Sequence, residues 1–143
     1  MKHALAYIKS CYRVNQGGFT YQPQSGTVGF ARTAAGCCVL FLSGEYTAKE
    51  IPLAIEYLKR NFDSPMHFYY GQYYAAHAMY QVGGVEWENW YRRLNSHFLS
   101  RQSIDGSWSL TDRGRREVGP VYQTAIAVIA LSAPAHYLPI FQR

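Results

Sequence analysis

Apolar residues recur along the chain at the spacing of one helix turn, in segments separated by glycine, proline and polar residues. Leu5, Ile8 and the pair Cys11 and Tyr12 have this spacing, which places them on one face of a helix. Residues 15–18, with two glycines, then end the segment. Applied to the whole chain, the same reasoning predicts six helices, at 3–13, 30–43, 50–61, 67–82, 86–101 and 119–132.

The predicted helices alternate between two types. The helices at 30–43, 67–82 and 119–132 are rich in small residues and nearly continuously apolar, which indicates burial on most sides. The helices between them carry aromatic residues on one face and charges on the other. In the helix at 86–101 the apolar stripe is formed by Trp87, Trp90, Tyr91, Leu94 and Phe98. The alternation predicts about three helical hairpins joined by glycine-rich turns.

Several boundaries depend on single residues. The third helix has two possible starts, because Thr47 and Glu50 resemble a capping box while Pro52 fits the first turn of a helix that begins near Ile51. Residues 19–28 and 102–118 lack helical periodicity and are predicted to be loops. Pro134 and Pro139 predict an extended or irregular tail.

The chain also resembles itself at fixed shifts. A shift of 40 positions brings Ala35 and Gly44 onto Ala75 and Gly84. A shift of 91 matches Thr33, Ala34 and Leu40 with Thr124, Ala125 and Leu131. Such weak similarity is typical of stacked helical pairs, each of which presents one face to its neighbours.

Composition is that of one folded domain covering residues 1–143. Hydrophobic residues make up 48% of the chain and charged residues 16%, which excludes a disordered chain. The formal charge is +5, but the densest basic cluster, Arg113, Arg115 and Arg116, lies in a predicted loop without a nucleic-acid recognition motif. A solvated loop is therefore favoured, and no nucleic-acid partner is expected. No segment has the length of a transmembrane helix, and residues 1–13 lack the apolar core of a signal peptide.

The three cysteines favour a reducing compartment such as the cytoplasm. Cys11, Cys37 and Cys38 are an odd number, and the adjacent pair lies in an apolar helix where buried thiols are common. We expect no disulfide framework.

The most specific motif is Gln102-Ser-Ile-Asp105-Gly106-Ser-Trp108, between two predicted helices. A looser form, Gln16-Gly-Gly18-Phe19, follows the first helix. Gln can bond free helix amides, Gly permits a tight turn and the aromatic ring packs over it, so the motif is structural. The first form resembles the QW repeat of squalene and hopene cyclases, and Gly-Gly-Phe resembles its counterpart in protein prenyltransferase β subunits.

This resemblance implies an α/α toroid, in which inner helices surround a cavity and outer helices form a second ring. Such toroids generally contain about six helix pairs, whereas this sequence predicts three at most. The resemblance therefore implies part of a ring, a partial α-α barrel. The ring would be completed by the remainder of a longer parent chain, of which this is the C-terminal portion, or by a second copy; an open arc is the third alternative.

The reaction motifs of that superfamily are not found in the sequence. No Asp-x-Asp-Asp acid motif is present, and Cys37 has Ala35 two positions before it instead of the aspartate of the prenyltransferase zinc site. The five histidines show no metal-ligand spacing, so we assign no metal, no cofactor and no catalytic residue. A carbohydrate-active toroid, based on Asp105 and Asp112, ranks last, because the turn motif explains Asp105 better.

A row of aromatic residues in the fourth helix forms the candidate ligand site. The residues recur every three or four positions and share one helix face, which could line a cavity for an isoprenoid-like hydrophobic ligand. The alternative, favoured on general grounds, is that they pack between helices with their hydroxyls at the rim. The row consists of Tyr70, Tyr73, Tyr74, His77 and Tyr80.

The resemblance thus implies a repeat domain of the terpenoid cyclase and prenyltransferase type, without a complete catalytic site, that acts as a structural, ligand-binding or partner-binding module. The alternative is a part of such an enzyme, acting on an isoprenoid, whose catalytic residues lie outside this chain.

Overall fold

Helices dominate the part of the chain that the computed structural model describes, residues 2–24, 26–109 and 119–135. The expectation of a helical chain is confirmed for these residues, with one small β-hairpin as the exception. The helices are α1 (Lys2–Ser10), α2 (Phe30–Leu42), α3 (Ile51–Arg60), α4 (Phe68–Val82), α5 (Gly84–Leu99) and α6 (Pro120–Leu131). The other elements are strands β1 (Tyr12–Arg13) and β2 (Gly18–Phe19) and a 3-10 turn, η1 (Ala133–Ala135).

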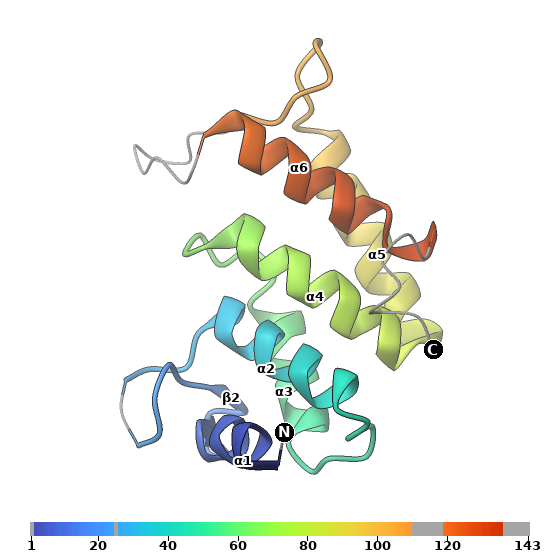
Figure 1. Cartoon of the computed structure of the whole chain (residues 1–143). Coiled ribbons are helices and arrows are strands. Elements are labelled where there is room, and N and C mark those ends of the chain that lie inside the picture. The colour runs from blue at the N-terminus through green and yellow to red at the C-terminus, as the bar shows by residue number, and fades with distance from the viewer. Residues whose placement is uncertain (1, 25, 110–118, 136–143) are drawn as a thin grey trace.

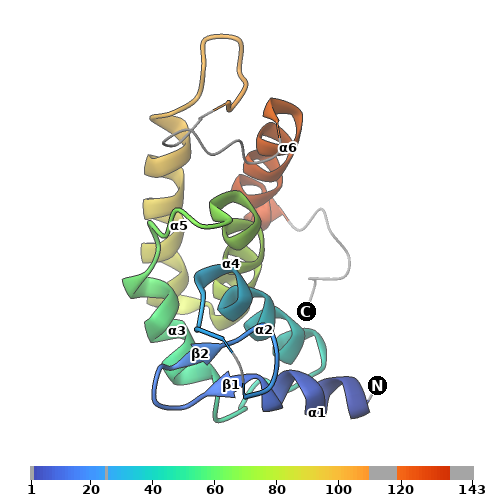
Figure 2. The ribbon, with the colours of Figure 1, turned by 90° about the vertical axis from the view of Figure 1, so that its left-hand side faces the viewer.

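The helices form two layers. α2, α4 and α6 lie side by side, with α4 in the middle (Figure 1). In the side view, α3 and α5 form the second layer and α1 lies across the lower end (Figure 2). The first layer contains the three helices rich in small residues, and α4 packs against both of its neighbours in that layer. None of the helices in the described segments is long and apolar enough to cross a bilayer.

The β-hairpin corrects the prediction of an all-helical chain and of a first helix reaching residue 13. α1 ends at Ser10, and Tyr12 and Arg13 pair antiparallel with Phe19 and Gly18. The carbonyl of Cys11 accepts hydrogen bonds from the amide and the hydroxyl of Thr20, each at 3.0 Å. Hydrogen bonds to a residue nine positions away therefore replace the next turn of the helix. The spacing of apolar residues in 3–13 could not show these contacts.

Other boundaries differ by smaller amounts. α3 begins at Ile51 with Pro52 in its first turn, and no side-chain hydrogen bond caps it, so the Pro52 interpretation is confirmed and the capping box is wrong. α5 begins at Gly84, two residues before the predicted start, because Gly83 alone separates it from α4 at a φ of +72°. Residues 133–135, expected to be irregular, form η1. The predicted loop at 110–118, with the three clustered arginines and Asp112, and Pro139 lie outside the described residues.

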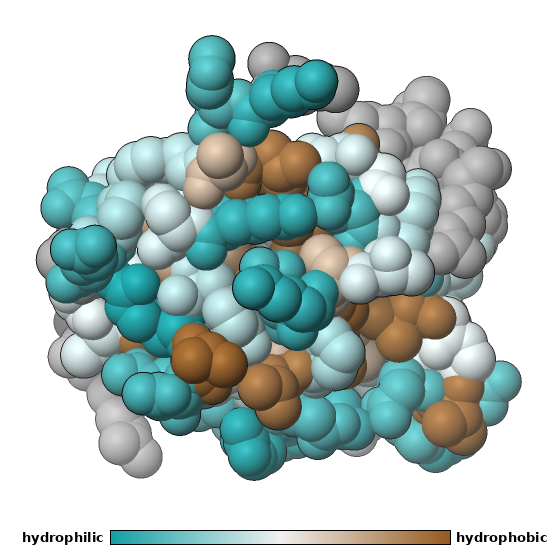
Figure 3. Space-filling view, turned by 90° about the horizontal axis from the view of Figure 1, so that it is seen from below, coloured by the Kyte–Doolittle hydropathy of each residue, from teal (hydrophilic) through white to brown (hydrophobic). Residues whose placement is uncertain are grey.

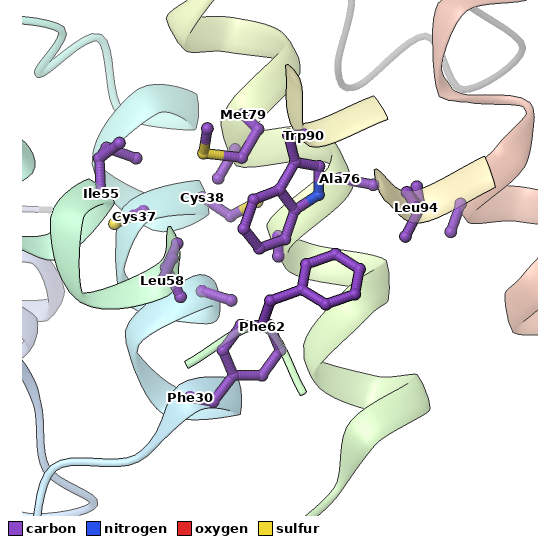
Figure 4. Packing of buried hydrophobic residues seen from close by; sticks show 14 of the residues in the cluster. Phe30, Cys37, Cys38, Ile55, Leu58, Phe62, Ala76, Met79, Trp90 and Leu94 are labelled. Carbon is purple, nitrogen blue, oxygen red and sulfur yellow. The ribbon is translucent and has the colours of Figure 1, made fainter. Parts of the chain in front are cut away.

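The core forms where the two layers meet. Phe62, which follows α3 and is fully buried, packs its ring edge-on against Trp90 of α5 at a centroid distance of 4.9 Å. The Phe30 ring of α2 also stacks on Trp90, at a centroid distance of 6.3 Å, and Figure 4 shows the three rings close together. The predicted apolar stripes of α3 and α5 thus face the same interior, and Trp90, Leu94 and Phe98 are buried as expected.

We expect Gly36→Ala to lower the stability of the protein. A Cβ at this position would lie 2.7 Å from the Phe19 ring, which is itself buried, so the strain exceeds the gain in helix propensity. The free energy of unfolding should fall by about 1 to 2 kcal/mol, measured by urea denaturation.

The control is to measure the effect of Gly36→Ala again in a protein that also carries Phe19→Leu. The smaller side chain leaves space for the added methyl group, so Gly36→Ala should cost less there. Equal costs in the two backgrounds would contradict the contact between Gly36 and the Phe19 ring.

Candidate functional site

The first turn motif attaches the hairpin to α2. The amide of Phe19 donates a hydrogen bond of 3.1 Å to the hydroxyl of Thr33, in the first turns of α2. The Phe19 ring is 2% exposed and lies directly over Gly36, one turn further along α2. Gly18 is required at the turn, because a Cβ there would lie 2.4 Å from Val28 and 2.6 Å from the Thr33 hydroxyl.

The second turn motif has the same kind of anchor. The amide of Trp108 donates a 3.0 Å hydrogen bond to the hydroxyl of Thr124 in α6. The buried Trp108 ring also donates from Nε1 to the carbonyl of Phe98 at 2.8 Å, and so satisfies a carbonyl near the C-terminus of α5. In both motifs an aromatic residue is tied by its backbone to a threonine in the following helix.

The remaining motif residues act within the turns. Gln102 donates to the carbonyl of Gly106 at 2.9 Å, and Gln16 accepts from the amide of Val28 at 3.4 Å, so neither bonds the free amides of a helix as expected. The Asp105 carboxylate accepts hydrogen bonds from the amide and hydroxyl of Ser107, which lower its pKa. These contacts give Asp105 a structural role in the turn.

The aromatic row of α4 is brought together only in part. Ring centroids are 4.9 Å apart between Tyr70 and Tyr74, 4.8 Å between Tyr74 and Tyr73, and 5.1 Å between Tyr73 and His77. Tyr80 instead packs edge-on against Trp87 of α5 at 5.2 Å. Four of the five predicted residues therefore form a continuous cluster, and Tyr80 belongs to the packing between α4 and α5.

Burial controls the ionisation of this cluster. It lowers the pKa of His77 to about 4, so the imidazole is neutral at pH 7. Burial also raises the pKa of the Tyr74 phenol, and its hydrogen bond with Tyr70 acts in the same direction. The cluster is thus uncharged at neutral pH, as a packed or apolar environment requires.

The groups able to form a metal or acid site are separated or already engaged. Burial raises the pKa of Cys37 to about 12 and also raises that of Cys38, whose thiol donates to the Tyr74 carbonyl at 3.1 Å. Both thiols are therefore protonated at neutral pH. Within residues 2–24, 26–109 and 119–135, no three His, Cys, Asp or Glu side chains are close enough to hold a metal ion. Surface ion pairs engage Glu45 with Lys9, Glu56 and Glu86 with Lys59, and Asp63 with Arg93.

The described residues enclose an apolar pocket of about 830 Å³, which we call the α1/α2 pocket. Its walls come from α1, the β-hairpin, one face of α2, and the segment between α3 and α4. Ile8, Phe19, Ala35, Gly36 and Val39 form its apolar part. Of the predicted aromatic row only Tyr70, at the start of α4, reaches its wall.

Among the polar residues of the pocket wall, Arg32 and His67 lie near the N-terminal ends of α2 and α4. Arg32 is in the first turn of α2, and His67 precedes α4 with a left-handed φ of +54°. The Tyr57 hydroxyl donates to the Val28 carbonyl at 3.4 Å. The lower end of the molecule, where α1 lies, presents separate hydrophobic patches among hydrophilic side chains (Figure 3).

The pocket lies against α2, whereas the sequence suggested a cavity along the aromatic row of α4, of which Tyr70 reaches the pocket wall. The sequence predicts that the helix at 30–43 is buried on most sides, whereas in the structure Ala35, Gly36 and Val39 of this helix line the pocket. The signal was present in the adjacent Gly-Gly-Phe turn, because Phe19 covers Gly36 and brings the hairpin over α2. The position of this turn over α2 follows from tertiary contacts, which the sequence pattern does not show.

Comparisons with protein family models, curated proteins and solved structures give no match to this chain.

We expect Trp108→Ala to lower the free energy of unfolding by about 3 kcal/mol, because it removes a buried ring packed edge-on against Phe98. Trp108→Phe keeps an aromatic ring and loses the Nε1 hydrogen bond, so it should cost about 1 to 2 kcal/mol. Thermal and urea unfolding of the two variants measure the difference. An unchanged melting temperature in Trp108→Ala would contradict the anchoring role of the ring.

Proposed function

We propose that this chain is a helical-repeat module, of the type found in squalene cyclases and protein prenyltransferase β subunits, that binds an elongated hydrophobic ligand. The observation that carries the proposal is the α1/α2 pocket, whose volume of about 830 Å³ lies within the usual range for small-molecule sites. Its walls are mainly apolar, with a smaller polar part that includes Arg32, and this is the usual composition of a ligand site.

The chemistry of the described residues supports binding over reaction. The thiols of Cys37 and Cys38 are buried and protonated, and Asp105 is held within its turn. The carboxylates of Glu45 and Asp63 form surface ion pairs. These side chains have structural explanations, so the proposed module uses the α/α architecture without the reaction chemistry of those enzymes.

The toroid is part of this proposal, and the edge of the array supports it. α6 has no charged side chain and leaves Val121 84% exposed and Val128 49% exposed. α4, by contrast, is covered on both sides by α2 and α6. An apolar face at the end of a helical layer favours further helices beyond it, as in a ring.

Those helices come from a second copy of the chain or from a longer parent. If the chain belongs to a longer parent, that parent would be a terpenoid cyclase or prenyltransferase enzyme whose catalytic residues lie outside this chain.

Filling the pocket should prevent ligand binding. In Val39→Trp the indole would occupy the apolar part of the α1/α2 pocket. We expect affinity for the neutral fluorescent probe N-phenyl-1-naphthylamine, measured by titration, to fall by about ten-fold or more, which corresponds to at least about 1.4 kcal/mol.

Val85→Trp is the matched control, because Val85 is 66% exposed on α5 and is not part of the pocket wall. Its affinity for the probe should equal that of the wild type. Equal binding by the Val39 variant and the wild type, with both folded by circular dichroism, would refute ligand binding in this pocket.

The apolar face of α6 should control self-association if a second copy completes the ring. We expect sedimentation velocity to show a concentration-dependent dimer that is lost in the double variant Val121→Lys/Val128→Lys, because charge on this face prevents its burial. A wild type that stays monomeric at about 100 µM, a concentration at which even weak contacts of micromolar Kd assemble, would exclude the second copy and leave the longer parent.

A further inference from the structure

Arg32 is the unusual polar group of the α1/α2 pocket. Its side chain is partly buried in the pocket wall, and it makes no hydrogen bond or ion pair with any residue in the described ranges. Among the other arginines, Arg93 pairs with Asp63 and Arg101 donates to the carbonyl of His97. The exposed Arg60, like Arg32, has no such partner in the described ranges, but it lies outside the pocket wall. A guanidinium beside apolar walls is stabilised when an anion pairs with it.

The position of the Arg32 guanidinium is set by Gly29. A Cβ on Gly29 would lie 2.5 Å from Nη2, 2.9 Å from Nε and 3.0 Å from Cζ, so the planar group lies directly against the glycine. Burial raises the pKa of the nearby Tyr57 phenol, and the charge of Arg32 opposes that rise, which places the two groups within electrostatic reach. The donors of Arg32 are thus held at the polar end of the pocket.

The surface of α2 supplies an apolar track that starts at this charge. Arg32, Ala35, Gly36 and Val39 all line the pocket and are spaced three, four and seven residues apart, so they share one face of the helix. From Arg32 to Val39 this face extends over about 10 Å, at 1.5 Å per residue. Ile8 of α1 adds to the apolar end.

The charge of the wall indicates the charge of the ligand. The described residues that line the pocket include one arginine and one histidine, and no lysine, aspartate or glutamate. One guanidinium matches one carboxylate, to which it can donate two parallel hydrogen bonds. A phosphate or diphosphate carries more charge and more acceptor oxygens than this wall can pair.

We propose that the α1/α2 pocket binds an unbranched aliphatic carboxylate, with its carboxylate on Arg32 and its chain along Ala35, Gly36 and Val39 toward Ile8. This inference rests on the proposed ligand-binding function and specifies the ligand of the same site.

The test compares twelve-carbon amphiphiles that differ only in their head groups. Dodecanoate, dodecanol, dodecyl phosphate and dodecyltrimethylammonium, each below its micelle concentration, are titrated against the protein with bound N-phenyl-1-naphthylamine. We expect dodecanoate to displace the probe at about ten-fold lower concentration than dodecanol, the effect of one charge-assisted hydrogen-bond pair. Dodecyl phosphate should bind no better than dodecanoate, and the ammonium compound should bind most weakly.

Variants of Arg32 test whether its charge causes the preference for dodecanoate over dodecanol. Arg32→Gln should bring dodecanoate to within about two-fold of dodecanol and leave dodecanol unchanged, because only the charged contact is lost. Arg32→Glu should reverse the order in favour of the ammonium compound. Arg60→Gln is the control, since Arg60 is an exposed arginine on α3 outside the pocket wall, and it should behave as the wild type. Circular dichroism checks that each variant is folded.

The outcomes separate the two proposals. Equal displacement by dodecanoate and dodecanol, unaffected by Arg32→Gln, would overturn the carboxylate inference and leave the proposed hydrophobic ligand in place. Ten-fold tighter binding of dodecyl phosphate would also overturn it, in favour of a phosphate head group. If Val39→Trp leaves displacement by every amphiphile unchanged, the proposed function itself is refuted.

Discussion

The close approach of α2 and α4 is the constraint on which the rest of the structure depends. The Phe30 ring of α2 lies over Gly71 of α4, where a Cβ would be 2.5 Å from the ring and 3.3 Å from the backbone of Ala31. Small residues on both helices are fully buried, including Ala34 on α2 and Ala75 on α4. With the two backbones this close, Phe30 can reach Trp90, and the aromatic interior joins both layers. The exposed side of α2 then remains available for the pocket.

The two turn motifs stabilise the two outer helices of the layer formed by α2, α4 and α6 in a comparable way. Each combines a buried aromatic ring with one backbone hydrogen bond to a threonine, Thr33 for Phe19 and Thr124 for Trp108. A hydrogen bond of this type contributes about 1 kcal/mol, whereas a buried aromatic ring contributes about 3 kcal/mol or more. Burial of the ring therefore supplies most of the stability, and the threonine determines where along the following helix the ring sits.

The lining of the proposed ligand pocket includes neither the Cys37 and Cys38 thiols nor the ion-paired carboxylates. The Cys37 and Cys38 thiols are protonated and His77 is neutral. The carboxylates of Glu45 and Asp63 form ion pairs, and that of Asp105 is held in a turn. The α1/α2 pocket, by contrast, has apolar walls and one guanidinium without a partner in the described part of the chain. A hydrophobic cavity with a single fixed charge orients an amphiphilic ligand, because the charge selects one end and the apolar walls take the other. The proposed functions follow from this contrast.

Local patterns in the sequence determined the helices. The spacing of apolar residues located all six, and the buried stripe of α5 through Trp90, Leu94 and Phe98 was predicted because helical periodicity depends only on near neighbours. Tertiary structure decided the hairpin at Tyr12, since its hydrogen bonds join residues that the helix period does not relate. Tertiary structure also decided where the pocket lies, because a row of tyrosines at helical spacing has the same sequence pattern whether it packs between helices or lines a cavity. The pocket arises where the segment after the hairpin folds back over Gly36, and the meeting of distant segments is a property of the packed chain that no local pattern contains.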